Sequence, residues 1–261
     1  GNDKMYGRRG DDHMYGGCGN DKMKGGRGDD HMYGGCGNDK MKGGRGDDQM
    51  YGGCGDDKMK GGRGDDHMYG GCGDDKMKGG RGDDHMYGGC GDDKMKGGRG
   101  DDHLYGGCGH NVMKGGRGND TYHIEPGSDN VIKDGRGKDT VKFEGDQDDY
   151  TMERRGDDLI ITNKEDGTRV LIKDQYAGKG VDSLEFADGK FKDFDSVGKE
   201  DQGDCGCDPE PKPCGDGGGH HDQHIYHHHI YHPINEDRGG EGGGDGPGCG
   251  DNDGGNDGCS A

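Results

Sequence analysis

The sequence predicts an all-β solenoid, and three observations support this prediction. From residue 7 to residue 123 a nine-residue pattern, G-[GR]-x-G-x-[DN]-x-[MLVY]-x, occurs thirteen times without a gap. Copies with Arg at the third position alternate with copies with Cys there, so the full repeat is eighteen residues. Only 23% of the residues are hydrophobic, which without the period would indicate disorder. A strict short period in so polar a chain indicates stacked coils that contact only their neighbours.

The glycines at positions one, two and four and the acid at position six resemble the nonapeptide of the repeats-in-toxin (RTX) family of secreted calcium-binding proteins. The resemblance implies that GGxGxD forms a turn and the last three residues a short strand. Two nonapeptides then complete one eighteen-residue coil of a parallel β-roll. The resemblance implies a calcium-binding β-roll over residues 1–142 and a C-terminal β cap over 143–200. Composition marks residues 201–261 as a Gly/Asp/Cys/His-rich tail, which could dock on a neighbouring subunit.

The position-six acids are the candidate calcium ligands. Each ion is expected between consecutive coils, held by carboxylates and glycine carbonyls, because oxygen ligands without histidine favour Ca²⁺. At Asn111 an amide replaces the acid, which predicts a weaker or empty site. Degenerate copies follow at 124–132 and, after one extra residue, at 134–142. The candidates are Asp12, Asp30, Asp48, Asp66, Asp84, Asp102 and Asp120 in one column, Asp3, Asp21, Asp39, Asp57, Asp75, Asp93 and Asp129 in the other, and Asp139.

Folding is expected to depend on these ions. Ordering the chain costs about 1–2 kcal/mol per residue, and a chain with so few apolar side chains cannot offset that cost by burial alone. Metal binding to the folded state would supply the difference. Position eight, which is Met in nearly every copy, is expected to point inward as a packed thioether core.

Positions seven and nine are expected to point outward and to give two unlike faces. One face carries histidine and tyrosine, and the tyrosines predict a packing or sugar-binding surface. The other face carries two columns of lysine, where like charges on neighbouring strands repel. The lysine columns therefore predict an anionic partner, either an anionic polysaccharide or an acidic protein surface.

The eleven cysteines predict an oxidising compartment. Cysteines of neighbouring coils would have Cα atoms about 4.8 Å apart, inside the disulfide range of about 4.4–6.8 Å. Bonds along the edge, bonds to the tail and bonds to a second molecule are all open, and cross-linking is favoured over a soft-metal thiolate ladder. The disulfide candidates are Cys18, Cys36, Cys54, Cys72, Cys90, Cys108, Cys205, Cys207, Cys214, Cys249 and Cys259.

Two further segments carry expectations. In the tail, His224, His227, His228 and His229 could bind Zn²⁺ or another transition metal. The same segment repeats the His-x-Tyr pattern of the array and could instead add as a strand to a roll. Alternating residues at 140–143, 158–162, 169–173 and 181–186 predict strands of the cap, which resembles the segment closing RTX arrays.

The function predicted from these features is structural. The chain starts at the fourth residue of a copy, so its first coil is expected to expose strand edges, which favours an extracellular, head-to-tail homopolymer cross-linked by cysteines. The alternative is the C-terminal binding or secretion module of an adhesin, toxin or secreted enzyme, and a third possibility is a metal-scavenging protein. No enzyme motif such as HExxH or GxSxG occurs, and no membrane span, signal peptide or nucleic-acid partner is predicted. Residues 1–123 hold 22 acidic and 20 basic side chains, so most of the net charge of −20 belongs to residues 124–261.

Overall fold

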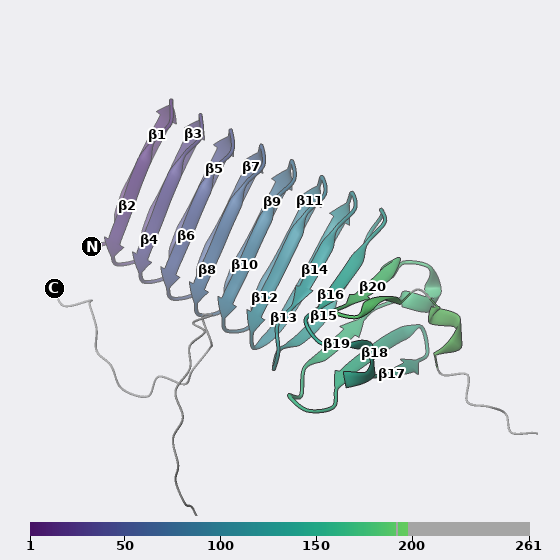
Figure 1. Ribbon diagram of the computed structural model, residues 1–261. Coiled ribbons are helices and arrows are strands. Elements are labelled where there is room, and N and C mark those ends of the chain that lie inside the picture. Colours follow the sequence, from purple (N-terminus) through teal and green to yellow (C-terminus); the bar gives the residue numbers. More distant parts are fainter. Residues whose placement is uncertain (192, 198–261) are drawn as a thin grey trace, which may run out of the picture. The chain divides into compact units, whose positions relative to one another are not determined.

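The computed structural model describes residues 1–191 and 193–197. Two sheets face each other along residues 4–143, and the chain passes from one to the other after each strand, as the regular coils in Figure 1 show. The predicted all-β solenoid with eighteen residues per coil is therefore confirmed. The tail candidates lie outside the described residues: His224, His227, His228, His229, Cys205, Cys207, Cys214, Cys249 and Cys259.

The first sheet has eleven strands, and its neighbours are parallel as far as β19 and antiparallel beyond it. In spatial order they are β1 (Lys4–Arg9), β3 (Lys22–Arg27), β5 (Lys40–Arg45), β7 (Lys58–Arg63), β9 (Lys76–Arg81), β11 (Lys94–Arg99), β13 (His110–Arg117), β15 (Asp129–Ile132), β19 (Arg169–Ile172), β18 (Asp158–Asn163) and β17 (Tyr150–Arg155).

The second sheet has ten strands, parallel except for the final pair. In spatial order they are β2 (His13–Cys18), β4 (His31–Cys36), β6 (Gln49–Cys54), β8 (His67–Cys72), β10 (His85–Cys90), β12 (His103–Cys108), β14 (Thr121–Ile124), β16 (Thr140–Phe143), β20 (Ser183–Phe186) and β21 (Gly189–Phe191).

The strands of the array are longer and the turns shorter than the resemblance implied. Each strand starts at position seven of one copy and continues through position three of the next, as in β7 (Lys58–Arg63). Only the glycine at position four and the residues at positions five and six form the turn. Glycine at position two is required inside the strand: Gly62 has φ +145°, and a Cβ there would collide with the carbonyl of Gly44 one coil earlier.

The core lies between the two sheets and consists mainly of position-eight side chains, as predicted. Met32, Met50 and Met68 are fully buried, and Met41 and Met59 on the opposite sheet are 3% exposed. Strand pairing brings each methionine level with the methionine of the next coil. Each coil of the array therefore adds adaptable thioether side chains to a continuous methionine column on each sheet.

The strands β13 and β14 pair with strands nineteen residues further along the chain, one more than in the array, and one expectation is wrong for this reason. Asp129 pairs with His110, and Asn130 pairs with Asn111. The extra residue therefore lies within the turn at residues 125–128, before β15, and not between the two degenerate copies. As a result Asn130 is fully buried in the position-six column, while Asp129 is displaced from it and is only partly buried.

Antiparallel strands end both sheets. The four predicted strands are present within two residues of their expected limits as β16, β18, β19 and β20, and β17 and β21 add one antiparallel neighbour to each sheet. Three short 3₁₀ segments, η1 (Gln147–Asp149), η2 (Gln175–Ala177) and η3 (Phe194–Ser196), connect or follow these strands. Phe143 and Phe186 stack at 4.9 Å, so aromatic packing replaces the methionine column here.

Candidate functional site

The turns bring the position-six aspartates into two buried columns. Asp48 is fully buried, and its Oδ1 accepts the backbone N–H of Asp30 at 3.0 Å. The N–H of Asp48 in turn donates to Oδ1 of Asp66, also at 3.0 Å. The second column repeats the arrangement: the N–H of Asp39 donates to Oδ1 of Asp57 at 2.7 Å. One oxygen of each carboxylate therefore links consecutive coils.

The other oxygen of each carboxylate has no hydrogen-bond partner, although it is buried. Leaving a buried polar group unpaired costs about 1–3 kcal/mol, and more when the group is charged, so the same orphan oxygen in successive coils indicates a site for a cation. The oxygens are Oδ2 of Asp12, Asp21, Asp30, Asp39, Asp48, Asp57, Asp66, Asp75, Asp84, Asp93, Asp102 and Asp120.

In the column that contains Asp39, glycine carbonyls converge on the same space. A Cβ placed on Gly34 would overlap both Oδ2 of Asp39 and the carbonyl oxygen of Gly52. Position one of the repeat is glycine because any side chain would fill the space beside the carboxylate. Carboxylate and carbonyl oxygens on a flexible glycine backbone are the donor set that Ca²⁺ prefers, so the residues present fit the ion that the sequence predicts.

The stacked carboxylates are electrostatically unfavourable when they are alone. Burial, followed by repulsion from Asp66 and Asp30, raises the pKa of Asp48 to about 8. Burial, followed by the charges of Asp66 and Asp102, raises the pKa of Asp84 to about 8 as well. Like charges in a desolvated column favour the protonated form, and a divalent cation between the coils would remove that penalty.

The ends of the columns differ from their middles. Asp3 is exposed, although its N–H donates to Oδ1 of Asp21 at 2.6 Å. Asp139 lies in the column of Asp120, whose N–H donates to Asp139 Oδ1 at 2.8 Å. Sequence reasoning missed Asp182, whose Oδ2 accepts the N–H of Asp139 at 2.9 Å and extends this column into the cap. Asp182 lies 43 residues after Asp139 in the sequence, which is not a multiple of nine, so the nine-residue period does not indicate that the two residues are neighbours.

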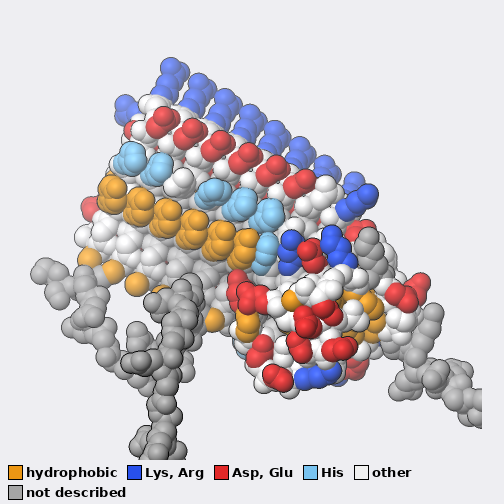
Figure 2. All heavy atoms as spheres, viewed as in Figure 1, with side chains coloured by type: hydrophobic (Ala, Val, Ile, Leu, Met, Phe, Trp, Pro, Cys, Tyr) orange, Lys and Arg blue, Asp and Glu red, His pale blue; other side chains and the backbone are white. Residues whose placement is uncertain are grey.

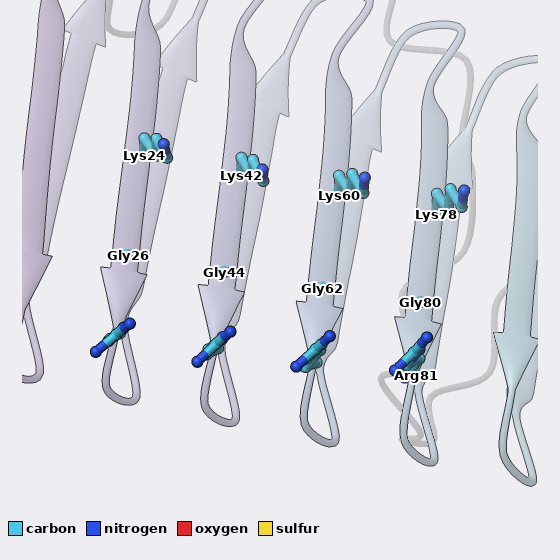
Figure 3. Close-up of a pocket in the computed structure, with 12 residues that line it drawn as sticks. Lys24, Gly26, Lys42, Gly44, Lys60, Gly62, Lys78, Gly80 and Arg81 are labelled. Carbon is cyan, nitrogen blue, oxygen red and sulfur yellow. The ribbon is translucent and has the colours of Figure 1, made fainter.

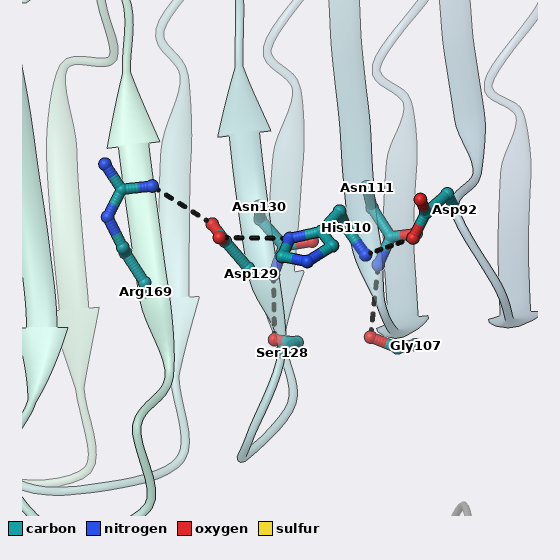
Figure 4. Close-up of polar contacts among 8 residues, drawn as sticks. All are labelled: Asp92, Gly107, His110, Asn111, Ser128, Asp129, Asn130 and Arg169. Atoms are coloured by element: carbon teal, nitrogen blue, oxygen red, sulfur yellow. Dashed lines mark hydrogen bonds and ion pairs between the residues drawn. The ribbon is translucent and has the colours of Figure 1, made fainter.

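Two amides interrupt the second column, and Figure 4 shows their contacts. Oδ1 of Asn111 accepts the N–H of Asp93, as an aspartate would, but its Nδ2 donates to the carbonyl of Gly107 at 3.2 Å. Nδ2 of Asn130 donates to Ser128 at 2.8 Å. At Asn111 the amide thus satisfies a glycine carbonyl, which agrees with the expectation of a weaker site in this coil.

The displaced Asp129 makes contacts outside the columns. Its carboxylate lies 3.0 Å from Nδ1 of His110 and 3.4 Å from a guanidinium nitrogen of Arg169 (Figure 4). Asp129 therefore lies outside the position-six column in which the sequence placed it, and its carboxylate contacts His110 and Arg169 instead.

A second ladder of side chains follows position five, which sequence reasoning did not single out. The N–H of Asp65 donates to Oδ1 of Asp47 at 2.8 Å, and the N–H of Asp56 donates to Oδ1 of Asn38 at 3.0 Å. These side chains are exposed and accept hydrogen bonds whether they are Asp or Asn. The signal was present, because every copy up to residue 101 has Asp or Asn at this position.

The unequal roles of the two neighbouring acids give a paired test. We expect Asp66→Asn to lower the number of bound calcium ions and to raise the calcium concentration needed for folding, because one buried orphan carboxylate is lost. Asp65→Asn, at the adjacent position five, should change neither quantity. Calorimetric titration of both variants with Ca²⁺ measures the difference. Equal effects of the two substitutions would contradict the assignment of position six.

The two outer faces of the array are unlike, as predicted. Figure 2 shows a row of histidines beside a row of hydrophobic side chains on one face. The tyrosines there form a continuous stack: the rings of Tyr33 and Tyr51 lie 4.8 Å apart and 2° from parallel. His85 and His103 stack at 4.7 Å. The outer positions of the other sheet carry the lysines Lys22, Lys24, Lys40, Lys42, Lys58, Lys60, Lys76, Lys78, Lys94 and Lys96.

A shallow cationic groove crosses the lysine sheet. Lysine at position nine and arginine at position three line it, with glycine between them, and Figure 3 shows the two rows of side chains repeated at each coil. Since the pairing is in register, Lys60 lies beside Lys78 and Arg63 beside Arg81. The lining residues are Lys24, Arg27, Lys42, Arg45, Lys60, Arg63, Lys78, Arg81 and the glycines Gly26, Gly44, Gly62 and Gly80.

The array cysteines lie in register at one edge of the second sheet, as the period predicts. Cys54 pairs in register with Cys72. Both are free thiols, as is Cys18, so the Cys54–Cys72 pair is not a disulfide. The prediction of covalent cross-linking at other positions stays a prediction.

Comparison with known proteins agrees with the repeat geometry. The family model of the RTX calcium-binding nonapeptide repeat matches residues 1–23, 15–50, 24–59, 51–86, 60–95 and 87–122. No curated protein matches the chain. In the described ranges, no helix is both long and apolar enough to cross a membrane.

Proposed function

The chain belongs, through residues 1–122, to the family of the RTX calcium-binding nonapeptide repeat, and we propose that it is an extracellular structural protein whose β-roll folds around calcium and assembles end to end. RTX repeats imply a calcium-binding, secreted domain. The parallel roll is a structural and binding fold, and we assign it no reaction.

The observation that carries the calcium role is the buried, unpartnered Oδ2 oxygen found in coil after coil. A protein that folded without ions would leave this large and repeated electrostatic cost uncompensated. The coil at Asn111, where an amide nitrogen reaches the glycine carbonyl, shows how the same backbone is satisfied without a carboxylate.

Strand edges support assembly. Among the strands of residues 1–191, β1 and β2 each pair on one side only, and Tyr6 and Tyr15 on them are 57% and 65% exposed. Unpaired strand edges favour pairing with another chain. In the part of the chain that the structure describes, β17 and β21 are the last strands of the two sheets, and in the proposed filament one of them would pair with β1 or β2 of the next molecule.

Electron microscopy of the purified chain tests assembly. In millimolar calcium we expect filaments that fray after chelation, because the coils at each junction depend on the ions. Fraying after reduction as well would show that cysteines contribute covalent bonds between molecules. Isolated short rods under every condition would contradict assembly and would favour the alternative, a calcium-folded module of an adhesin, toxin or secreted enzyme.

The cationic groove supports a second role, binding of an anionic polysaccharide. Two parallel rows of positive charge repeat along the groove, and among the described residues these lysines and arginines form no ion pair. A linear polymer with a regularly spaced carboxylate could lie along the rows, whereas a folded acidic protein would match their period less well. The charge of the array itself is close to balanced, so bound calcium would leave it net positive.

Polygalacturonate, a linear carboxylated polysaccharide, is a suitable probe. We expect it to bind the calcium-loaded chain in low salt and to lose most of its affinity at 0.5 M NaCl, because exposed charges are screened. The double substitution Lys60→Gln and Lys78→Gln should weaken binding several-fold, and Lys58→Gln with Lys76→Gln, outside the groove, should weaken it less. Surface plasmon resonance against neutral dextran measures both; equal binding of dextran would contradict this role.

A further inference from the structure

We propose that Asp120, Asp134 and Asp139 form a distinct metal site at the end of the roll, with three carboxylates where the repeated sites have two. This site would bind Ca²⁺ more tightly than the repeated sites do. A trivalent, oxygen-seeking cation would also bind here before it binds to the repeated sites. The comparison with the repeated sites rests on the calcium role proposed above, whereas the metal site itself does not.

The three side chains are held together by the last coils. One potential ligand atom from each lies within 4.8 Å of the others, and this is the only such group of three acidic, His or Cys side chains in the described part of the chain. Asp120 and Asp139 are consecutive members of one position-six column, joined by the 2.8 Å hydrogen bond from the N–H of Asp120. They alone would make an ordinary site of the array.

Asp134 is the addition. It occupies position one of the degenerate copy 134–142, where every copy from residue 7 to residue 123 has glycine. In those copies the glycine leaves room beside the carboxylate: a Cβ on Gly115 would collide with Asp120. Around Asp134 the strand is interrupted, and a single bridge between Arg117 and Arg136 replaces the regular pairing. Backbone hydrogen bonds from Lys133 to Met113 and from Arg136 to Gly116, both 2.9 Å, still join this segment to the preceding coil. The irregular segment thus carries a third acid at the position where the repeat has glycine.

The buried oxygens point to a ligand. Asp120 is fully buried and its Oδ2 has no hydrogen-bond partner. Oδ2 of Asp134 is likewise buried and unpartnered, while its Oδ1 accepts the N–H of Gly135 at 2.5 Å. Within the described part of the chain, no lysine or arginine forms an ion pair with any of the three. Because calcium affinity rises with the number of charged ligands, the third carboxylate distinguishes this site from those of the array.

A tyrosine provides an optical probe of this site. Tyr122 replaces methionine in the core, is fully buried, and its hydroxyl accepts the N–H of Gly115 at 2.7 Å. Gly115 and Asp120 belong to the same copy of the repeat, so the ring and the carboxylate lie on one coil. Terbium(III) is a trivalent, oxygen-seeking ion whose luminescence is sensitised by a nearby tyrosine.

The experiment is a terbium titration of the calcium-loaded full chain, so that the fold is kept throughout. We expect a first luminescence phase that corresponds to one terbium ion per chain. This phase should saturate at a terbium concentration at least about tenfold lower than the remaining phases. Asp134→Gly restores the glycine of the repeat, should fold in calcium by circular dichroism, and should lose the first phase while keeping the others. Asp66→Asn, in the middle of the array, should keep the first phase.

The outcomes separate the two proposals. A single phase in the natural chain, unchanged by Asp134→Gly, would overturn the distinct site and leave calcium binding by the array intact. A first phase that survives in Asp134→Gly would also overturn it. If chelation leaves the circular dichroism unchanged and terbium enters only one site, which Asp134→Gly abolishes, the distinct site stands and the calcium role of the array fails.

Discussion

We expect removal of calcium at pH 8 to unfold the β-roll. At this pH most of the stacked aspartates are ionised, and without an ion their buried oxygens face one another across consecutive coils with no partner. The thioether core, one buried side chain per strand, cannot compensate for this cost together with the entropy of ordering each coil. We therefore expect the β-sheet circular dichroism of the array to be lost on addition of a chelator and restored by millimolar Ca²⁺.

Protonation of the buried aspartates at acid pH should partly replace calcium in stabilising the folded chain. The pKa of Asp48 and of Asp84 is raised to about 8, and that of Asp66 to about 7, chiefly by burial. Because these values lie above the ordinary pKa near 4 of the unfolded chain, the calcium-free folded state takes up protons. Its stability is therefore fully present below about pH 4 and is lost as the pH rises through 7 to 8. The calcium-loaded chain should show the opposite trend, since protons compete with the ion.

Circular dichroism between pH 4 and pH 9, with and without chelator, measures both effects. The chelated chain should be folded at the acid end of the range and unfolded at the alkaline end. Urea unfolding at each pH would give the corresponding free energies. A chelated chain that keeps its spectrum at pH 8 would show that the carboxylate columns do not need an ion, and the calcium role would then fail.

A single methyl group at position one should damage the array in its middle. Gly61 has an ordinary φ, so backbone strain is not involved. A Cβ on it would nevertheless collide with Oδ2, Cγ and Cβ of Asp66, all of them close to a rigid turn. We expect Gly61→Ala to lower the free energy of unfolding in calcium by about 1–3 kcal/mol through overpacking. The substitution should also weaken the binding of Ca²⁺ beside Asp66.

The control is Gly1→Ala, since a Cβ there meets nothing within 4 Å. Urea unfolding of both variants in millimolar calcium gives the difference, and calcium titration reports on the ion. If Gly61→Ala proves as stable as Gly1→Ala and binds as much calcium, then position one does not border the ligand space as the geometry requires.

The strictness of the period explains why so much of this fold was predictable. Because each coil repeats the last, a prediction about the position of Met32 or Asp48 applies to the equivalent residue of every copy. The structure confirms the inward methionines and the two carboxylate columns. Prediction failed first where the period failed. One additional residue in the turn before β15 moved Asp129 onto the surface and put Asn130 in its place, because local spacing cannot reveal which side of a strand absorbs an insertion.

The sequence by itself determined the fold class, the eighteen-residue coil, the core position and the calcium-type ligands, since all of these depend on contacts between equivalent residues of neighbouring coils. Only the tertiary structure decided which oxygen of each carboxylate is left without a partner. It also brought Asp134 beside Asp120 and Asp139, and Asp182 onto the end of a column 43 residues away. These relations arise where the chain leaves its period, and there distance along the sequence no longer indicates distance in space.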